Sequence, residues 1–406
     1  MGSTTTLMPL AILLVAAKLA GAVSARFGLP SVVGKILVGV LLGPSVFGLF
    51  RTDALLSSVA SVGVILLMFM AGVETDLVQM RQVGVTALLV ACGGVLVPMV
   101  GGIALMRVWG YAWSTSVFVG VVLTATSVSV TAQTLKELGR LRSRVGTVIL
   151  GAAVIDDVLG IILLSVVIGL EGGGNPLRPL LSMGLFFIIA FALGEWVMPH
   201  LFRHLSGLKS REASLALVLA LIIVAAWAAE SFGKVAAITG AYLFGLAVAR
   251  HPAEERERIT YGIDLVGYGL FVPIFFVVVG LEANGSALVA APLFTALLIA
   301  IAVLTKAVGA FAGGIAGRLP MSEAFTVGVG MVTRGEVALV VATLGKEAGI
   351  LDGQLFAASL AMVLLTTIAT PVLLWFVAAP HVAAPVIPQP AYAVSASGQE
   401  TRRQAA

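Results

Sequence analysis

Residues 151–169 have the sequence Gly151-Ala-Ala-Val-Ile-Asp-Asp-Val-Leu-Gly-Ile-Ile-Leu-Leu-Ser-Val-Val-Ile-Gly169. This stretch is long and apolar enough to cross a bilayer as one helix, yet it contains the adjacent carboxylates Asp156 and Asp157. A charge at the bilayer centre costs about 3 kcal/mol even on lenient insertion scales, so it is kept where it is paired or used. Neighbouring residues of a helix point about 100° apart. We therefore expect the two carboxylates to have different tasks, one at an ion site and one against another helix; a purely structural pair is the alternative.

The composition indicates a helical protein embedded in the lipid bilayer. Of the 406 residues, 59% are hydrophobic and 11% are charged, whereas soluble domains contain about 25% charged residues. The formal net charge is +4, but the basic residues do not gather on a soluble face, so no nucleic-acid partner is expected. The single cysteine, Cys92, allows no intrachain disulfide, and no Cys/His spacing supports a zinc or haem site. We expect no cofactor.

Thirteen apolar segments are long enough to span the membrane. The predicted fold class is therefore an all-α polytopic membrane protein with about 13 transmembrane helices, joined mostly by short loops. The segments cover residues 7–25, 32–50, 54–73, 84–106, 113–135, 146–169, 179–202, 212–231, 234–250, 262–281, 287–314, 322–345 and 355–379.

The distribution of Lys and Arg between alternate loops predicts the orientation of the chain. One set of loops and ends holds 16 of the 24 basic residues, the other set holds 5, and 3 lie within helices. Basic residues favour the cytoplasmic side of a membrane. With an odd number of helices, we expect a multi-pass protein of the inner (plasma) membrane with its N-terminus outside and its C-terminus in the cytoplasm.

The thirteen helices divide into six, one and six, which predicts two inverted repeats. A single helix between two six-helix halves gives the second half the opposite orientation. We assign residues 1–178 to the first inverted repeat, 179–211 to a linker helix and 212–379 to the second inverted repeat. Residues 380–406 are rich in Pro, Ala, Ser and Gln, a composition typical of a disordered tail, which we expect in the cytoplasm.

A run of hydroxyl side chains lies in the middle of segment 113–135, with the sequence Leu123-Thr-Ala-Thr-Ser-Val-Ser-Val-Thr131. Such hydroxyls compete for backbone hydrogen bonds, and β-branched residues lower helix propensity further. A helix that unwinds here would present hydroxyls and carbonyls at the membrane midplane, and hard cations favour oxygen ligands. The alternative is that these residues only pack against neighbouring helices.

Lys306 lies deep inside the apolar segment 287–314, too far from either end for its ammonium group to reach water easily. A buried ammonium group needs a carboxylate partner, and Asp156 and Asp157 are the two that this chain offers. A structural lysine in a polar crevice is the alternative.

A second glycine-rich and charged run, Gly328-Val-Gly-Met-Val-Thr-Arg-Gly-Glu-Val-Ala338, lies in the fifth helix of the second half. The hydroxyl run occupies the fifth helix of the first half. Two interrupted helices in corresponding positions are typical of a transport site, so we predict discontinuous crossing helices. We interpret Arg334 and Glu336 as a pair that stabilises the broken helix ends.

Five features together carry a resemblance to a known family. They are Gly151-Ala-Ala-Val-Ile-Asp-Asp-Val-Leu-Gly160, Ala125-Thr-Ser-Val-Ser-Val-Thr-Ala132, Leu67-Met-Phe-Met-Ala-Gly-Val-Glu74, the deep Lys306, and Arg334-Gly-Glu-Val-Ala-Leu-Val340. The chain resembles the bacterial sodium/proton antiporters of the monovalent cation:proton antiporter-2 family, and within it the NapA-type members, over residues 7–379.

This resemblance implies a homodimer whose core bundle moves like an elevator against a dimerisation domain. It also implies that Asp157 binds the cation, that Asp156 pairs with Lys306, and that Thr126 and Ser127 line the unwound helix. The expected ligands of Na⁺ are thus Asp157, Thr126 and Ser127. Relatives with Asn in place of the first Asp are usually electroneutral, so Asp156 favours electrogenic exchange.

The resulting hypothesis is a secondary active antiporter that exchanges Na⁺ or Li⁺ for H⁺, with both ions competing for one site. A K⁺/H⁺ antiporter or another cation transporter is the first alternative. An intramembrane aspartyl enzyme is a weaker one, because such a protease needs aspartates on two different helices. A prenyl-diphosphate enzyme needs Asp-Asp-x-x-Asp, and position 160 is Gly. We therefore expect a transporter rather than an enzyme.

Overall fold

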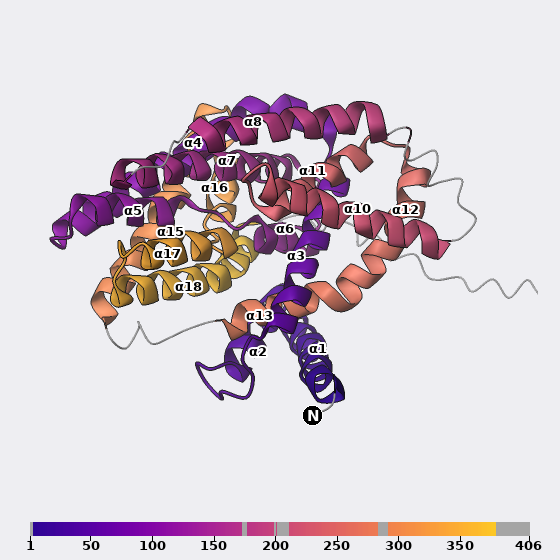
Figure 1. Ribbon diagram of the computed structural model, residues 1–406, viewed down its shortest axis with the longest axis horizontal. Coiled ribbons are helices and arrows are strands. Elements are labelled where there is room, and N and C mark those ends of the chain that lie inside the picture. The colour runs from indigo at the N-terminus through magenta and orange to yellow at the C-terminus, as the bar shows by residue number, and fades with distance from the viewer. Residues whose placement is uncertain (1–2, 173–176, 199, 201–210, 283–290, 379–406) are drawn as a thin grey trace, which may run out of the picture.

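The computed structural model describes residues 3–172, 177–198, 200, 211–282 and 291–378, and over these residues it contains helices and no strands (Figure 1). The all-α class is therefore confirmed. Two of the elements, η1 and η2, are π-helical turns. The elements are α1 (Ser3–Arg26), α2 (Ser31–Leu42), α3 (Ala54–Glu74), α4 (Leu77–Val108), α5 (Trp113–Thr124), α6 (Val128–Glu137), α7 (Arg144–Gly172), α8 (Leu177–Ala192), η1 (Leu193–Val197), α10 (Arg211–Ser231), α11 (Ala237–Ala249), α12 (Ala253–Val266), η2 (Gly267–Phe271), α13 (Val272–Leu281), α15 (Pro292–Ala316), α16 (Met321–Gly330), α17 (Glu336–Glu347) and α18 (Gly353–Ala378).

Within the described ranges, nine helical stretches are long and apolar enough to cross a membrane, and four shorter ones are apolar as well. The protein is thus a multi-pass helical protein by length and composition, while the number of thirteen crossings stays a prediction. The tail expected over 380–406 lies outside the described residues, as do residues 199 and 201–210 of the expected linker helix.

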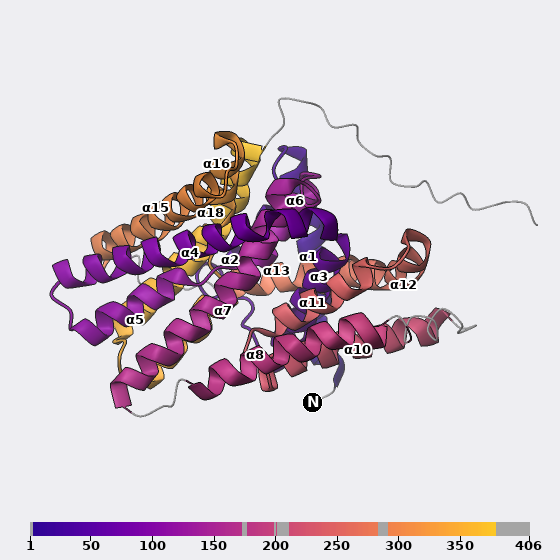
Figure 2. The ribbon, with the colours of Figure 1, turned by 90° about the horizontal axis from the view of Figure 1, so that it is seen from above.

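The helices form two bundles. We call α4, α5, α7 and α15–α18 the crossing bundle and α1–α3 and α10–α13 the flanking bundle, because the helices pack mainly within these groups. Figure 2 shows α4, α5 and α15 on one side of the molecule and α3, α11 and α12 on the other. Helix α6 lies between them and contacts α2, α3, α7 and α18. Each bundle draws on both halves of the chain, and the division into sequential inverted repeats stays a prediction.

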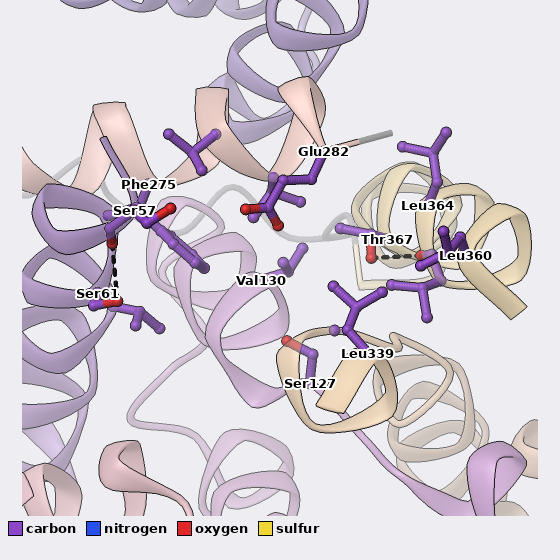
Figure 3. A pocket seen from close by; sticks show the side chains of 16 residues that line it. Ser57, Ser61, Ser127, Val130, Phe275, Glu282, Leu339, Leu360, Leu364 and Thr367 are labelled. Atoms are coloured by element: carbon purple, nitrogen blue, oxygen red, sulfur yellow. Dashed lines mark hydrogen bonds between the residues drawn. The ribbon is translucent and has the colours of Figure 1, made fainter. Parts of the chain in front are cut away.

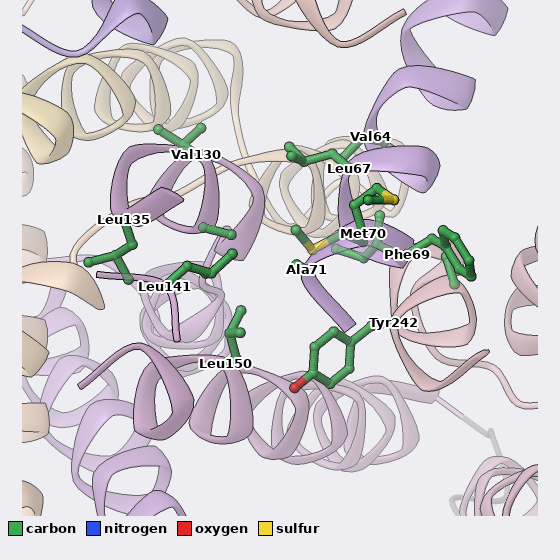
Figure 4. Packing of buried hydrophobic residues seen from close by; sticks show 14 of the residues in the cluster. Val64, Leu67, Phe69, Met70, Ala71, Val130, Leu135, Leu141, Leu150 and Tyr242 are labelled. Carbon is green, nitrogen blue, oxygen red and sulfur yellow. The ribbon is translucent and has the colours of Figure 1, made fainter. Parts of the chain in front are cut away.

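A buried apolar cluster joins the two bundles around α6. Val64 and Leu67 of α3 lie across from Val130 of α6, and Leu150 of α7 lies near Tyr242 of α11 (Figure 4). Helices α3, α7 and α11 are apolar on several faces, which is typical of helices buried in a membrane protein, whereas α6 also contains polar and charged residues. The contact surface between the bundles is therefore apolar near the middle of the molecule.

The crossing bundle contains two interrupted helices. Helix α5 ends at Thr124 and α6 begins at Val128, while α16 ends at Gly330 and α17 begins at Glu336. The two interruptions meet, because the Ser127 amide donates to the Thr333 carbonyl at 2.9 Å. The Thr131 hydroxyl group likewise donates to the Gly330 carbonyl at 2.8 Å. Non-helical backbone is tolerated at membrane depth where other protein groups form hydrogen bonds with its free amides and carbonyls. Here the residues at one interruption form such hydrogen bonds with the residues at the other.

Helices α4 and α15 cross at Gly93 and Gly309, where no side chain separates the two backbones. A Cβ atom added to Gly93 would lie 2.2 Å from the Gly309 carbonyl oxygen, and one added to Gly309 would lie 2.1 Å from the Gly93 oxygen. Small residues allow membrane helices to approach this closely. The next glycine, Gly94, makes room for the stem of Lys306, whose Cε would lie 3.3 Å from an added Cβ. The crossing therefore sets where the lysine side chain of α15 enters the bundle.

We expect Gly93→Ala to lower the melting temperature of the protein. The added methyl group would meet the α15 backbone, and overpacking of this kind costs about 1–3 kcal/mol. The matched control is Gly84→Ala in the same helix, where a Cβ meets nothing within 4 Å and Ala stabilises a helix by about 1 kcal/mol relative to Gly. Thermal unfolding of both variants in detergent makes the comparison. Equal melting temperatures would contradict the close crossing.

Candidate functional site

The structure brings Asp156 and Lys306 together inside the crossing bundle. Asp156 is 2% exposed and Lys306 is fully buried. The Lys306 Nζ atom lies 3.1 Å from Asp156 Oδ1 and 3.2 Å from Oδ2. It also donates to the Thr124 carbonyl at 2.6 Å, at the last residue of α5. The ammonium group thus compensates the carboxylate of α7 and the free helix end beside it.

Arg334 lies in the second interruption and is fully buried. Its Nη1 atom donates to the Ala125 carbonyl at 2.9 Å, and Nη2 donates to the Ala302 carbonyl at 3.2 Å. The guanidinium group therefore bonds backbone carbonyls of the first interruption and of α15, where an unpaired carbonyl in the membrane interior would be costly. The expected partner Glu336 begins α17, but its side chain lies outside the described part of the structure.

Asp157 faces a different neighbour from Asp156, as the helical spacing predicts. Its Oδ2 atom accepts a hydrogen bond of 2.8 Å from the hydroxyl group of Thr239 on α11. Asp157, Thr239 and Thr126 line one small cavity of about 10 Å³, close to the space that a single water molecule needs. Oxygen atoms from three separate segments, 125–127, α7 and α11, thus converge on this cavity.

Ser127 lines a second cavity, of about 220 Å³. Glu282 lies across this cavity from Ser127 (Figure 3). Residues 125–127 are extended, with φ −56° and ψ 136° at Ala125 and φ −99° and ψ 116° at Ser127, and side chains alternate along extended backbone. Thr126 and Ser127, which were expected to bind one cation together, therefore line different cavities.

A larger cavity of about 550 Å³ lies between the bundles and is lined by both Asp156 and Asp157. The exposed Glu230 and Lys234 also line it, as does Ser61 of α3. It runs between α3, α5, α7, α17 and the start of α11. Both carboxylates are therefore reached from the side where α10 joins α11.

Polar contacts close the opposite end of the gap between the bundles. Lys136, near the end of α6, forms an ion pair of 2.7 Å with Glu74 of α3, and its Nζ atom lies 3.9 Å from the centre of the Tyr268 ring. Glu137 accepts hydrogen bonds from the amide and hydroxyl groups of Ser31. Glu74 follows Ser61 by 13 residues, roughly 20 Å along α3. The structure is thus open on one side of the carboxylates and closed on the other.

Sequence reasoning did not anticipate Thr239 or the contacts of α6. Thr239 is a lone threonine in an apolar helix, where most such residues only pack. Lys136 and Glu137 belong to a charged helix end that is ordinary at a membrane surface. Nothing in the sequence distinguishes these residues, because their role depends on partners that are distant along the chain.

Two interrupted helices that cross beside buried carboxylates, with a cavity leading to them, define a membrane transport protein. A sequence model of the family described as "Sodium/hydrogen exchanger, transmembrane" matches residues 12–377, and the chain belongs to this family. Its members are cation/proton antiporters, which are transporters rather than enzymes. The resemblance to sodium/proton antiporters is thereby confirmed.

The relatives include proteins of similar length. The Na(+)/H(+)-K(+) antiporter GerN of Bacillus cereus is 38% identical over 90% of this chain and 94% of its own. The Na(+)/H(+) antiporter of Enterococcus hirae is 33% identical over 90% and 96%. Among solved structures, the sodium proton antiporter MjNhaP1 from Methanocaldococcus jannaschii at pH 8 matches with a TM-score of 0.70 over 92% of this chain and 96% of that chain. At 18% identity, that match shows the shared fold alone.

Breaking the Asp156–Lys306 contact from one side is expected to destabilise the protein. Either Asp156→Asn or Lys306→Met leaves a buried charge without its partner, which costs about 3–5 kcal/mol. The double variant should recover part of the loss. Thermal unfolding of the four proteins gives the coupling between the two positions.

The control for this cycle is Arg144 and Glu323, which are 3.8 Å apart with side chains 46% and 34% exposed. A pair so accessible to water should couple by less than about 1 kcal/mol. If the losses at 156 and 306 were simply additive, the buried contact would have no energetic weight.

Proposed function

We propose that the protein is a secondary active antiporter that exchanges Na⁺ or Li⁺ for H⁺. One observation carries this proposal: Asp157 and hydroxyl groups line a cavity of about 10 Å³, next to a carboxylate already paired with Lys306. Carboxylate and hydroxyl oxygens are the ligands that hard cations favour. Membership of the sodium/hydrogen exchanger family supports the same reaction.

In the proposed cycle, Asp157 binds the cation together with Thr126, and protons displace it on the other side of the membrane. Ser127 lies in the same interruption as Thr126 but lines the other cavity, so in this proposal it shapes the interruption and does not contact the cation directly. Asp156 remains paired with Lys306 until a cation enters, when the lysine loses its partner and releases a proton. Arg334 and Glu336 hold the helix ends in place.

The proposed movement is of the elevator type, in which the crossing bundle slides against the flanking bundle and the carboxylates change sides. The cavity of about 550 Å³ on one side of the carboxylates and the polar contacts of Lys136 on the other support alternating access. Residues 1–178 and 212–379 would be the two inverted repeats, joined by 179–211. The active form would be a homodimer in the plasma membrane, with the N-terminus outside and the C-terminus in the cytoplasm.

A second candidate is exchange of K⁺ for H⁺. The name of the Bacillus cereus relative includes K⁺ as well as Na⁺, so relatedness alone does not separate the two cations. Proton movement in proteoliposomes with Na⁺, Li⁺ or K⁺ as the only added cation discriminates between them.

Replacing Asp157 with Asn is expected to abolish cation-dependent proton movement, because the variant loses the negative charge that both ions share. The fold should survive, since Asp156 and Lys306 keep their contact. Dye quenching in proteoliposomes measures the activity, and thermal unfolding checks the fold. Sodium-driven proton release near the wild-type rate would remove Asp157 from the site.

The exchange is expected to respond to the membrane potential. In the proposed cycle two protons leave for each cation bound, one from Asp157 and one from Lys306 as its contact with Asp156 breaks. One net charge therefore moves, and each charge is worth about 2.3 kcal/mol per 100 mV. Sodium uptake into proteoliposomes clamped at opposite potentials with potassium and valinomycin tests this. Equal wild-type rates at both potentials would make the exchange electroneutral.

The Lys306→Gln variant extends this test. It removes the ammonium group that pairs with Asp156, so transport should persist with weaker voltage dependence. Lys346→Gln is the matched control, because Lys346 is exposed and should keep the wild-type voltage dependence. Unchanged voltage dependence in Lys306→Gln would separate this lysine from charge movement.

A further inference from the structure

Thr239 is buried, at 2% exposure, and its hydroxyl group does not serve its own helix. Several other buried threonines donate to the carbonyl four residues earlier, as Thr134 does to Val130 and Thr370 to Thr366, each at 2.8 Å. Thr239 is the third residue of α11 and donates instead to Asp157 on α7 at 2.8 Å. Its hydroxyl group is thus directed at the carboxylate to which we assign the cation.

We infer that Thr239 supplies a hydroxyl ligand to the transported cation. A hydroxyl group has one hydrogen to donate and two lone pairs to accept with. When the hydrogen goes to Asp157 Oδ2, the lone pairs are left for a cation in the cavity that Asp157, Thr126 and Thr239 line together. Apart from Tyr242, whose hydroxyl group lies 3.2 Å from the Thr75 hydroxyl group, the rest of the wall consists of apolar residues such as Met68, Leu150 and Ile238. The side-chain oxygen atoms that could bind the cation are therefore few. This inference rests on the proposed cation exchange.

Thr239 and Asp157 lie in different bundles, so a cation that binds both of them also affects how the bundles are arranged. Asp157 belongs to the crossing bundle, whereas Thr239 belongs to α11, which packs on α3 and α10 of the flanking bundle. A cation bound to both residues bridges the two bundles. Since a ligand shifts a conformational equilibrium only through different affinities for its states, a bridging cation stabilises the arrangement in which both oxygens reach it. Thr239 would therefore be a cation ligand that also links occupancy to the relative position of the bundles.

The test compares Thr239→Val, which keeps the shape and removes the hydroxyl group, with Thr239→Ser, which keeps the hydroxyl group. The concentration of Na⁺ that gives half-maximal exchange is measured in proteoliposomes at one pH. Loss of an oxygen contact to a charged group should raise this concentration about ten-fold in Thr239→Val. Thr239→Ser should stay near the wild-type value. The control is Thr260→Val, a buried threonine of α12 whose hydroxyl group bonds Arg256 of its own helix.

A second measurement does not depend on transport. Added Na⁺ should raise the melting temperature of the detergent-solubilised wild type and of Thr239→Ser, and it should raise that of Thr239→Val much less at the same concentration. If Thr239→Val does not fold, Thr239→Ala takes its place in both measurements.

A wild-type half-maximal concentration in Thr239→Val, or equal changes in Thr239→Val and Thr239→Ser, would overturn the inference, because the hydroxyl group would then not matter. In that case the wild type still exchanges cations and the proposed function stands. If the wild type itself shows no cation-dependent proton movement, the proposed function fails and the assignment of Thr239 fails with it.

Discussion

A buried carboxylate and a buried ammonium group, Asp156 and Lys306, organise the centre of this protein through their direct contact. Removing two charges from water is expensive, so the Asp156–Lys306 contact adds little net stability, although leaving either charge alone would be severe. The pair is instead a geometric constraint, because the same ammonium group also bonds the Thr124 carbonyl. It therefore fixes α7, α15 and the end of α5 relative to one another. The glycine contact between α4 and α15 brings the lysine to this point.

The two bundles are joined unevenly around this centre. At one end, Lys136 and Glu137 of α6 bond residues of α2, α3 and the turn after α12. At the other end, cavities reach the carboxylates and Ser127. In the proposed cycle, the side with the polar contacts has to open while the other closes. The energy difference between the two states is then set partly by residues that never touch the transported ions.

The sequence was sufficient to predict structural features that depend on the types of residue in a segment. It was insufficient to predict contacts that depend on which way a helix face or a side chain points. The helical class and the two interruptions follow from apolar length, hydroxyl runs and glycines. A contact of Lys306 with one of the two aspartates follows because buried charges need partners, and the choice of Asp156 follows from the family resemblance. The approach of Thr239 to Asp157 joins residues 82 positions apart. Helices that are apolar all round do not reveal which face meets which neighbour. The separation of Ser127 from Asp157 likewise depends on extended backbone that a hydroxyl run alone does not specify.

The three extended residues between α5 and α6 have a mechanical consequence. Helix α5 packs on α4 and α7, whereas α6 is bonded through its far end to the flanking bundle. Any displacement between the bundles that occurs before those bonds break has to be absorbed by dihedral changes at Ala125, Thr126 and Ser127, as in other hinges at element ends. Thr126 would then be both a residue of this hinge and a ligand of the cation. Rotation at this hinge would reposition its oxygen, so the angle between α5 and α6 and the affinity for the ion would change together.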